Sequence, residues 1–503
     1  MRDQQKEDDG MHITSLVEGQ VNFKSLEKYI YNEVCQQACT ILSDVLKNLD
    51  LMLMAKRDKK QYRAKGIKHT CLKTIMGPVE YERRIYEYQT KDGLKAFRYL
   101  LDEYLNMDTV GHMSANLVEK VIESALNVPY RKAAENVSEL TGQSISHMAA
   151  WNLVQVLGEK MAKREDHQIE LNQHGKLKGE KETKVLFEEA DGLWISMQRK
   201  DRPKNSRSKK RELKLAVTYE GWSRRSGKAE AYEVINKCAS AGFTDSKKFK
   251  QIRDARTAAV YDVDGIELKI INGDGARWIK EGIDEEGIHF QLDPFHKSQA
   301  VVRNVTDKKA VVELVRMLNG EKAEESLRYV KKLQEKEGID IKAAEKLEKL
   351  YNYLAMNRDG IVPYYLREGL KMPVAPVGMT YRHLGTMEHN VCDILAQRMK
   401  HNKTSWTVSG ADHIAKILAE KASGSLYTMI NAVLYGVIPD EKFEEIVETV
   451  ILTAAQVNRQ PKKSNIYPVH KGSTPFEGSA VTAGRKAIRN MLQNRCASDF
   501  IYR

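Results

Sequence analysis

The segment Val185–Met197, which reads Val-Leu-Phe-Glu-Glu-Ala-Asp-Gly-Leu-Trp-Ile-Ser-Met, constrains the fold more than any other part of the chain. Alternate residues of a strand share a face, and Asp191 shares the parity of Val185, Phe187 and Leu193. A carboxylate on such an apolar face is costly unless positive charge meets it. The segment therefore predicts a strand that carries an acid with a function.

A second acid follows the same rule at the end of another apolar run. Asp274 has the parity of Leu268 and Ile270, and it lies between two glycines, where the backbone can turn. A solvent-exposed turn aspartate would not need that register. We expect Asp274 to lie at the end of a strand, directed toward the interior.

The order of the predicted elements indicates an α/β fold with an RNase H-like mixed sheet. Three antiparallel strands come first, and helices then alternate with strands, so that the first and fourth strands become neighbours. The predicted elements are strands at 185–197, 212–219 and 232–238, a helix at 244–260, a strand at 267–273, a short helix from Ala276, a strand at 289–292 and a helix from Pro294.

Glu388 is a third acid on a predicted apolar stripe, in a helix at 384–400. Leu384, Val391 and Leu395 lie four residues before it and three and seven after it. Three acids at one edge of a sheet would repel one another unless cations joined them. Carboxylates suit Mg²⁺ or Mn²⁺, and two such ions about 4 Å apart support phosphoryl transfer.

Each acid also has an ordinary interpretation, as a helix cap, a turn former or half of a buried ion pair. Glu188 and Glu189 flank Asp191 and are alternative ligands. Asp293 and His296 follow the last strand, where they would contact DNA or support the metal site. The alternative for this pair is an N-capping aspartate with a packed histidine.

The region before the sheet is predicted to be mainly helical, with a helix at 24–54 and β-hairpins around Gly77-Pro78 and 91–93. The segment 128–154 has helix-turn-helix spacing, with a second helix capped by Ser144 or Ser146. An ordinary helical hairpin is the alternative. The side chains that we expect to contact DNA here are Arg131, Lys132, His147 and Asn152.

The net charge of +12 indicates a polyanion partner. Eight lysines and arginines gather in 200–214, among them Lys209, Lys210 and Arg211, and nine more lie in the tail 459–503. A solvated surface is the alternative for such runs. Trp406 is a candidate for stacking on an exposed base, with core packing as its alternative.

Other features bound the class of protein. The chain has no apolar run of membrane-spanning length, and the N-terminus lacks the apolar segment of a signal peptide. The six cysteines are scattered without a Cys-x-x-Cys pair, which argues against a disulfide framework and a zinc ribbon. We expect a cytoplasmic protein that joins the nucleoid when bound to DNA, with no membrane partner.

Five regions follow from these patterns. We expect a DNA-binding N-terminal region at 1–165, the first part of the catalytic core at 166–305, a helical insertion at 306–380, the closing helices of the core at 381–457 and a basic tail at 458–503.

Several short motifs, taken in order, resemble the ISLre-type bacterial insertion-sequence transposases, which are Mutator-related DDE enzymes. They are Glu189-Ala-Asp-Gly-Leu-Trp-Ile, Ile271-Asn-Gly-Asp-Gly-Ala-Arg-Trp-Ile, Leu292-Asp-Pro-Phe-His, and Gly385-Thr-Met-Glu-His-Asn followed by Ala396-Gln-Arg-Met-Lys. The resemblance extends over most of the chain, from the Thr74-Ile-Met-Gly-Pro-Val hairpin and the Tyr130-Arg-Lys-Ala-Ala segment onward.

The resemblance implies that Asp191, Asp274 and Glu388 form the acidic triad, with a helical insertion between the second and third members. It also implies that Asp293 and His296 match the Cys/Asp-x-x-His element of Mutator-type enzymes. The implied function is a DNA transposase that binds terminal inverted repeats, cuts with two Mg²⁺ or Mn²⁺ ions and joins the end to target DNA, as a homo-oligomer on DNA. The alternatives are a nuclease of the same fold that does not join strands, and a DNA-binding regulator derived from a transposase.

Overall fold

The computed structural model describes residues 22–435, apart from 106, 108–111, 205–207, 226–230, 337–339 and 401–403. The chain divides into two units, Met1–Val450 and Ile451–Arg503. The closing helices predicted within 381–457 fall partly outside the described residues, and the basic tail lies wholly outside them. Among the helices that are described, none is both long and apolar enough to cross a membrane.

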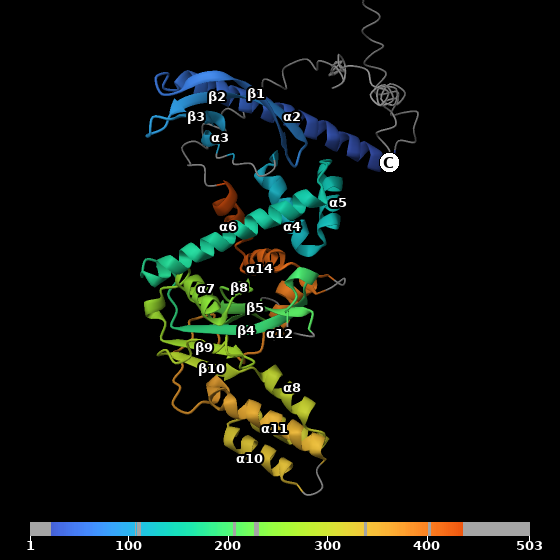
Figure 1. Ribbon diagram of the computed structural model, residues 1–503, viewed down its shortest axis with the longest axis vertical. Coiled ribbons are helices and arrows are strands. Elements are labelled where there is room, and N and C mark those ends of the chain that lie inside the picture. The colour runs from blue at the N-terminus through green and yellow to red at the C-terminus, as the bar shows by residue number, and fades with distance from the viewer. Residues whose placement is uncertain are drawn as a thin grey trace, which may run out of the picture. The chain divides into compact units, whose positions relative to one another are not determined.

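A five-stranded mixed sheet forms the centre of the first unit, with strand order β10-β9-β4-β5-β8 (Figure 1). Its strands are β4 (Val185–Ser196), β5 (Lys210–Tyr219), β8 (Cys238–Gly242), β9 (Leu268–Gly273) and β10 (Ile288–Leu292). β5 is antiparallel to both of its neighbours, whereas β4, β9 and β10 run parallel. The strands that precede Asp274 and contain Asp191 are therefore neighbours, as the sequence predicted, and Ala190 lies opposite Gly273.

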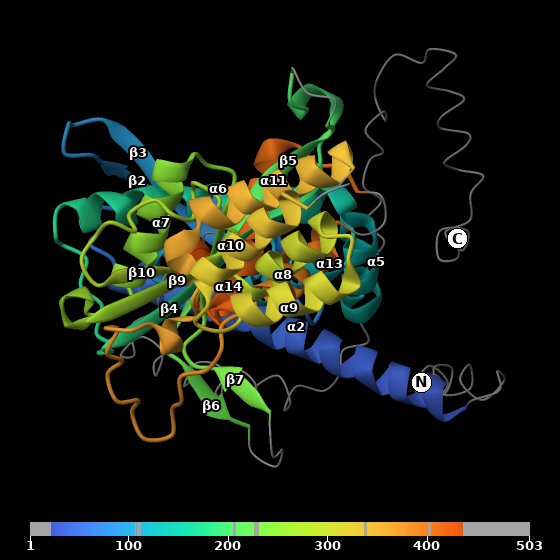
Figure 2. The same cartoon turned by 90° about the horizontal axis from the view of Figure 1, so that it is seen from below.

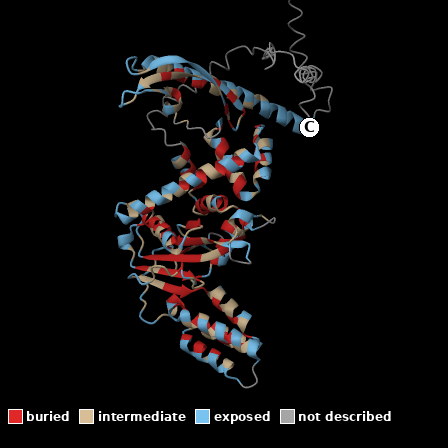
Figure 3. Ribbon diagram, in the orientation of Figure 1, coloured by how far each residue is buried: buried red, intermediate tan, exposed pale blue. Residues whose placement is uncertain are grey.

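Both faces of the sheet are covered, so its strands are buried almost throughout (Figure 3). The face of Phe187 packs against α14 (Val408–Ala422) and the segment that follows Glu388. The face of Ala190 packs against α7 (Ser246–Ala258), where Phe249 and Ile252 are buried. Burial on both sides explains why β4 reads as a nearly continuous apolar run around its acids.

Three elements differ from the prediction. The third strand of the sheet is β8, whereas Tyr232–Val234 (β7) pairs with Trp222–Arg224 (β6) in a separate ribbon. The chain after Ala276 forms turns and no helix. The helix expected from Leu384 begins at Met387. The type, pairing and start of each of these elements depend on tertiary contacts that a local apolar pattern does not contain.

The N-terminal part contains the predicted long helix, hairpins and helix pair. Its elements are α2 (Phe23–Lys56), β1 (Arg63–Lys73), β2 (Pro78–Gln89), β3 (Lys95–Tyr99), α3 (Leu100–Tyr104), α4 (Ala115–Asn127), α5 (Tyr130–Thr141) and α6 (His147–Gln173). Gly142 ends α5 in the left-handed conformation, and the Ser146 hydroxyl caps α6 by accepting from Ala149 N–H. These two residues set the turn between α5 and α6.

Four helices after β10 pack on one another, in the region predicted as a helical insertion and just before it (Figure 2). They are α8 (Pro294–Asn304), α9 (Lys308–Leu318), α10 (Ala323–Gln334) and α11 (Ile341–Met356). The chain then returns to the sheet through α12 (Met387–Asn390), a π-helical segment (Val391–Ala396) and α13 (Gln397–Met399), before α14 and α15 (Leu426–Ile430).

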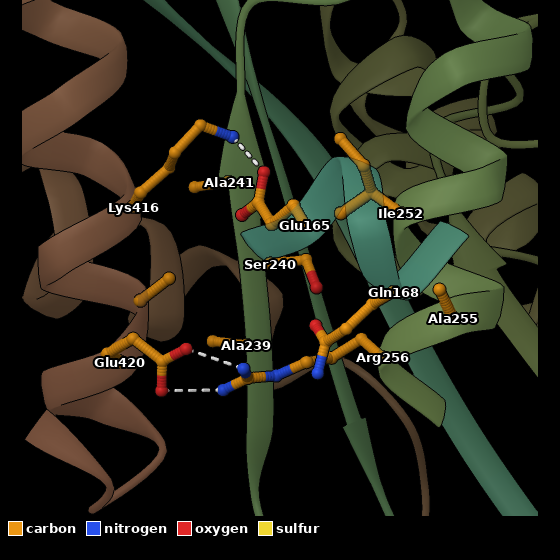
Figure 4. Close-up of a pocket in the computed structure, with 11 residues that line it drawn as sticks. Glu165, Gln168, Ala239, Ser240, Ala241, Ile252, Ala255, Arg256, Lys416 and Glu420 are labelled. Carbon is orange, nitrogen blue, oxygen red and sulfur yellow. Dashed lines mark hydrogen bonds and ion pairs between the residues drawn. The ribbon is translucent and has the colours of Figure 1, made fainter. Parts of the chain in front are cut away.

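A layer of buried ion pairs joins α14 to α6 and α7 around a small cavity of about 20 Å³ (Figure 4). Lys416 pairs with Glu165 of α6, and Arg256 of α7 holds Glu420 with two parallel hydrogen bonds, of which Nη2 to Oε2 measures 2.7 Å. A guanidinium and a carboxylate that pair in this way neutralise each other's charge and fill each other's hydrogen bonds, whereas a single buried charge would remain uncompensated. The layer fixes which residues of α14 face the sheet.

Glu188 is fully buried on the α7 side of β4, where it pairs with Arg253 and Lys269. Burial alone would raise the pKa of Glu188, but the two positive charges outweigh it and lower the pKa to about 2. We expect Glu188→Gln to lower the free energy of unfolding at pH 7 by about 3 to 5 kcal/mol, because it leaves two buried cations without their partner. Urea denaturation followed by circular dichroism measures this loss.

The pH dependence of the stability loss in Glu188→Gln provides a control for this prediction. The unfolded chain takes up this proton first as the pH falls, so the Glu188 contribution is complete above the ordinary glutamate pKa of 4.5 and disappears toward pH 2. The difference between wild type and variant should shrink over that interval. Glu313→Gln, which removes an exposed pair with Arg316, should change stability by less than about 1 kcal/mol. An equal loss in both variants would contradict the assignment.

Candidate functional site

Asp191 is the first residue of β4 beyond its pairing with β9. The ladder ends with Ala190 opposite Gly273, whereas pairing with β5 continues on the other side. The Asp191 side chain is 13% exposed, and its Oδ1 accepts from Gly192 N–H at 2.7 Å. Its second oxygen lies 3.5 Å from Nε2 of His296. The end of the ladder thus gives Asp191 a partly open position at the edge of the parallel strands.

His296 reaches this position from the first turn of α8. Burial opposes protonation of its imidazole, but the hydrogen bond and charge of Asp191, together with the charges of Asp293 and Asp274, raise the pKa of His296 to about 9. Three carboxylates therefore create a strongly negative potential at this imidazole. A site with this potential attracts a cation as well as a proton.

Glu388 completes a cluster that has the spacing of a metal site. One ligand atom each from Asp191, His296 and Glu388 lies within 4.8 Å of the other two. The prediction that Glu388 lies on a buried stripe is wrong, because its side chain is exposed. Leu384 precedes the helix, and the π-helical turn at 391–396 changes the helical period, so Glu388 lies at the rim of the cluster.

Asp274 lies beside this cluster. Its Oδ1 accepts from Ala276 N–H at 2.8 Å, which fixes the turn after β9. Burial and then the charge of Asp191 raise the pKa of Asp274, and His296 acts in the opposite direction. Asp274 thus contributes to the same negative potential. Among the described residues, however, the three whose ligand atoms lie within 4.8 Å of one another include His296 and not Asp274.

A buried network beneath the cluster holds these segments together. Glu189 is fully buried, and its carboxylate accepts from the Tyr219 hydroxyl, from Asn272 and from the backbone N–H groups of Gly385 and Thr386. Glu188 and Glu189 thus have partners of their own and do not replace Asp191. Because Gly385 and Thr386 immediately precede α12, Glu189 positions the helix that carries Glu388.

Asn272 links the network to α8. Its Nδ2 donates to Glu189 Oε2 at 2.9 Å and to Asp293 Oδ2 at 2.8 Å. The other oxygen of Asp293 accepts from Phe295 and His296 N–H at 2.9 and 3.1 Å, as the N-cap of α8. Asp293 therefore has the capping role that the sequence left open, and through it positions His296.

The remaining predicted residues lie away from this cluster or inside the core. Trp406 is only 7% exposed and donates its indole N–H to Met399 C=O, so core packing replaces the predicted base stacking. The other candidates are exposed and stay predictions of DNA contact: Arg131, Lys132, His147, Asn152, Lys209, Lys210 and Arg211. No local pattern indicates the roles of Asn272 and Thr386, because both depend on contacts between distant segments.

The fold and the cluster together define a mixed α/β protein with a carboxylate–histidine site suited to a cation at the ends of parallel strands. A family model described as an uncharacterised protein family, UPF0236, matches residues 16–433, and the chain belongs to that family.

Relatives are similar over most of the chain. A UPF0236 protein of Caldanaerobacter subterraneus subsp. tengcongensis is 24% identical over 416 residues, which are 82% of this chain and 79% of the relative, and its name joins eleven loci. A UPF0236 protein of Streptococcus gallolyticus, from the region 3′ of vanSb, is 23% identical and covers 82% and 86%. Among solved structures, the chain is similar to the Drosophila P element transposase strand transfer complex with a TM-score of 0.21 and 7% sequence identity. The match covers 70% of this chain and 92% of that chain.

The Asn272 bridge generates a stability prediction. We expect Asn272→Leu to lower the free energy of unfolding by about 2 kcal/mol or more, because it leaves the buried carboxylates of Glu189 and Asp293 without their shared donor. Asn304→Leu is the control, since the Asn304 amide donates to Ala300 C=O of its own helix and has no other hydrogen bond to the described part of the chain. Thermal denaturation of both variants measures the difference, and equal shifts would argue against the bridge.

Proposed function

We propose that this protein is a DNA transposase, which binds the ends of an insertion sequence and catalyses metal-dependent strand cleavage and strand transfer by a DDE mechanism. The observation that carries the proposal is the meeting of Asp191, His296 and Glu388, with Asp274 beside them, at the ends of neighbouring parallel strands. Ligands and catalytic groups gather at this edge in open α/β sheets.

The sheet supports the proposal. Its order, with one antiparallel strand between β8 and β4 and with β9 and β10 parallel to β4, is the order of an RNase H-like core. The helices α9–α11 stand between the segments of Asp274 and Glu388, where the resemblance implies an insertion.

The donor set fits a divalent cation. Carboxylates of Asp191, Glu388 and Asp274 suit Mg²⁺ or Mn²⁺, and the His296 imidazole favours Mn²⁺ because Mg²⁺ prefers oxygen ligands. When bound, two such ions activate an attacking oxygen and stabilise the leaving oxygen in phosphoryl transfer. Glu189 and Asp293 keep the ligands in place through α12 and α8. The negative charge of Asp274 strengthens the attraction of the site for a cation, which would screen the carboxylates from a phosphate.

Exposed basic residues support DNA as the substrate. The net charge is +12, and Lys209, Lys210 and Arg211 lie exposed at the start of β5, on the strand beside the one that carries Asp191. Exposed Arg131 and His147 lie at the starts of α5 and α6, the helix pair that we assign to end recognition. Because a transposase acts on two element ends, we expect a multimer on DNA.

The relatives offer an independent reason. The name of one relative contains eleven locus designations, and the name of another contains four. Both relatives come from the same organism. A mobile gene that multiplies in a genome produces many loci that encode one protein. An ordinary housekeeping enzyme is not expected to have so many gene copies.

The activity test uses labelled DNA that contains the flanks of this gene, with Mg²⁺ or Mn²⁺. We expect wild type to nick the DNA at the element end and join it to a target, and we expect Asp191→Asn and Asp274→Ala to lose at least about a hundredfold in rate, the size of effect typical for loss of a catalytic electrostatic group. Gel electrophoresis of the products measures both steps.

Controls separate chemistry from binding. Glu345→Gln, which changes an exposed acid on α11, should cut and join as wild type does. Both site variants should retain DNA binding. Cutting by Asp274→Ala at the wild-type rate would refute the catalytic assignment, and nicking without joining in wild type would identify a nuclease.

Salt dependence tests the basic loop. The slope of log Kobs against log salt concentration is negative, and each lost phosphate contact makes it shallower by about 0.9. We expect the double variant Lys209→Gln/Lys210→Gln to show a shallower slope, whereas Lys342→Gln/Lys346→Gln, on the exposed side of α11, should retain the wild-type slope. Fluorescence anisotropy at several salt concentrations provides the measurement, and identical slopes would exclude this loop from the DNA interface.

A further inference from the structure

A recess of about 480 Å³ lies between the end of β4, the start of β5 and the segment that joins β8 to α7. Its size falls within the range of sites that bind small ligands. It is lined by Trp194, Pro203, Lys210, Arg211, Glu212, Phe243, Thr244 and Asp245. These residues combine aromatic surface with positive charge.

Trp194 is the principal aromatic side chain of the recess. It lies on β4 opposite Glu212, and it is 50% exposed although its strand is otherwise nearly buried. An indole held on a rigid strand with one half uncovered offers a flat surface at little cost in conformational entropy. Such a surface stacks well on a planar ring.

The polar groups around Trp194 are suited to a nucleotide. Lys210 and Arg211 are exposed at the same end of β5 and provide positive charge for a phosphate. The Thr244 hydroxyl is buried and has no hydrogen-bond partner among the described residues. The two acids of the recess already have partners: Glu212 accepts from the Trp278 indole N–H, and Asp245 caps α7.

The recess borders the cluster through Gly192. A Cβ at Gly192 would lie 2.1 Å from Glu212 Oε1, so this glycine allows Glu212 to approach the strand next to Asp191. Trp194 is three residues beyond Asp191, so it lies roughly 10 Å along the strand and, by alternation, on the opposite face of the sheet.

We propose that this recess binds one unpaired nucleobase of the DNA next to the cutting site, stacked on Trp194 with its phosphate against Lys210 and Arg211. The inference rests on the proposed function, because it specifies how the same site holds its DNA. Stacking on Trp194 would offset the cost of taking this base out of the duplex.

The test compares two DNAs of the same element-end sequence in EDTA, so that neither is cut. One is a fully paired duplex, and the other has a short single-stranded 3′ extension that contains 2-aminopurine. We expect wild type to bind the extended DNA more tightly and to quench the 2-aminopurine. Trp194→Leu should bind the extended DNA about five- to a hundredfold more weakly, the range for loss of one base–aromatic stack, and should not quench.

Trp194→Phe is the matched variant, since it keeps a ring and should retain most of the preference and the quenching. Both variants should bind the paired duplex as wild type does, and circular dichroism should show that both are folded. A preference that survives in Trp194→Leu overturns the inference, as does equal binding of both DNAs by wild type. Failure of wild type to bind either DNA would instead overturn the proposed function and with it this inference.

Discussion

The site depends on how the protein accommodates several carboxylates at one edge of a sheet. Glu189, Asp191 and Asp293 converge there with Asp274, and like charges so close together would repel or take up protons. The inner two are met by hydrogen-bond donors, namely the Tyr219 hydroxyl, the Asn272 amide and backbone N–H groups at the starts of helices. The outer two, Asp191 and Asp274, each accept one backbone N–H, and Asp191 also faces His296, at the position proposed to hold a cation. The network thus separates acids that hold the fold from acids that remain available for chemistry.

The two faces of β4 solve the problem of buried charge in different ways. On one face Glu188 is paired with Arg253 and Lys269, and on the other Glu189 is surrounded by neutral donors. Ion pairing on the first face ties the strand to α7 and β9, whereas the neutral donors on the second face tie it to the segment before α12. Consecutive residues of one strand therefore anchor elements on both sides of the sheet.

Much of the sheet could be predicted from the sequence, because alternation and order are local properties. The parity of Asp191 and the adjacency of its strand to that of Asp274 follow from them, and both are present in the structure. The place of His296 in the cluster and the exposure of Glu388 could not be derived in this way. Both depend on where a helix begins, which Asp293 and Asn272 determine for α8 and Glu189 helps to determine for α12.

The long separation of Asp274 and Glu388 in the sequence is bridged by specific contacts. On one side, Tyr353 of α11 donates to Asp274 C=O at 2.9 Å, and Asn357 lies where a Cβ at Gly275, with φ of +90°, would come within 2.3 Å of its Oδ1. The inserted helices therefore support the Asp274 turn, and only glycine fits there. On the other side, Glu189 holds the residues just before Glu388. Each acid is positioned by a contact from far along the chain, so the intervening helices are part of what assembles the site.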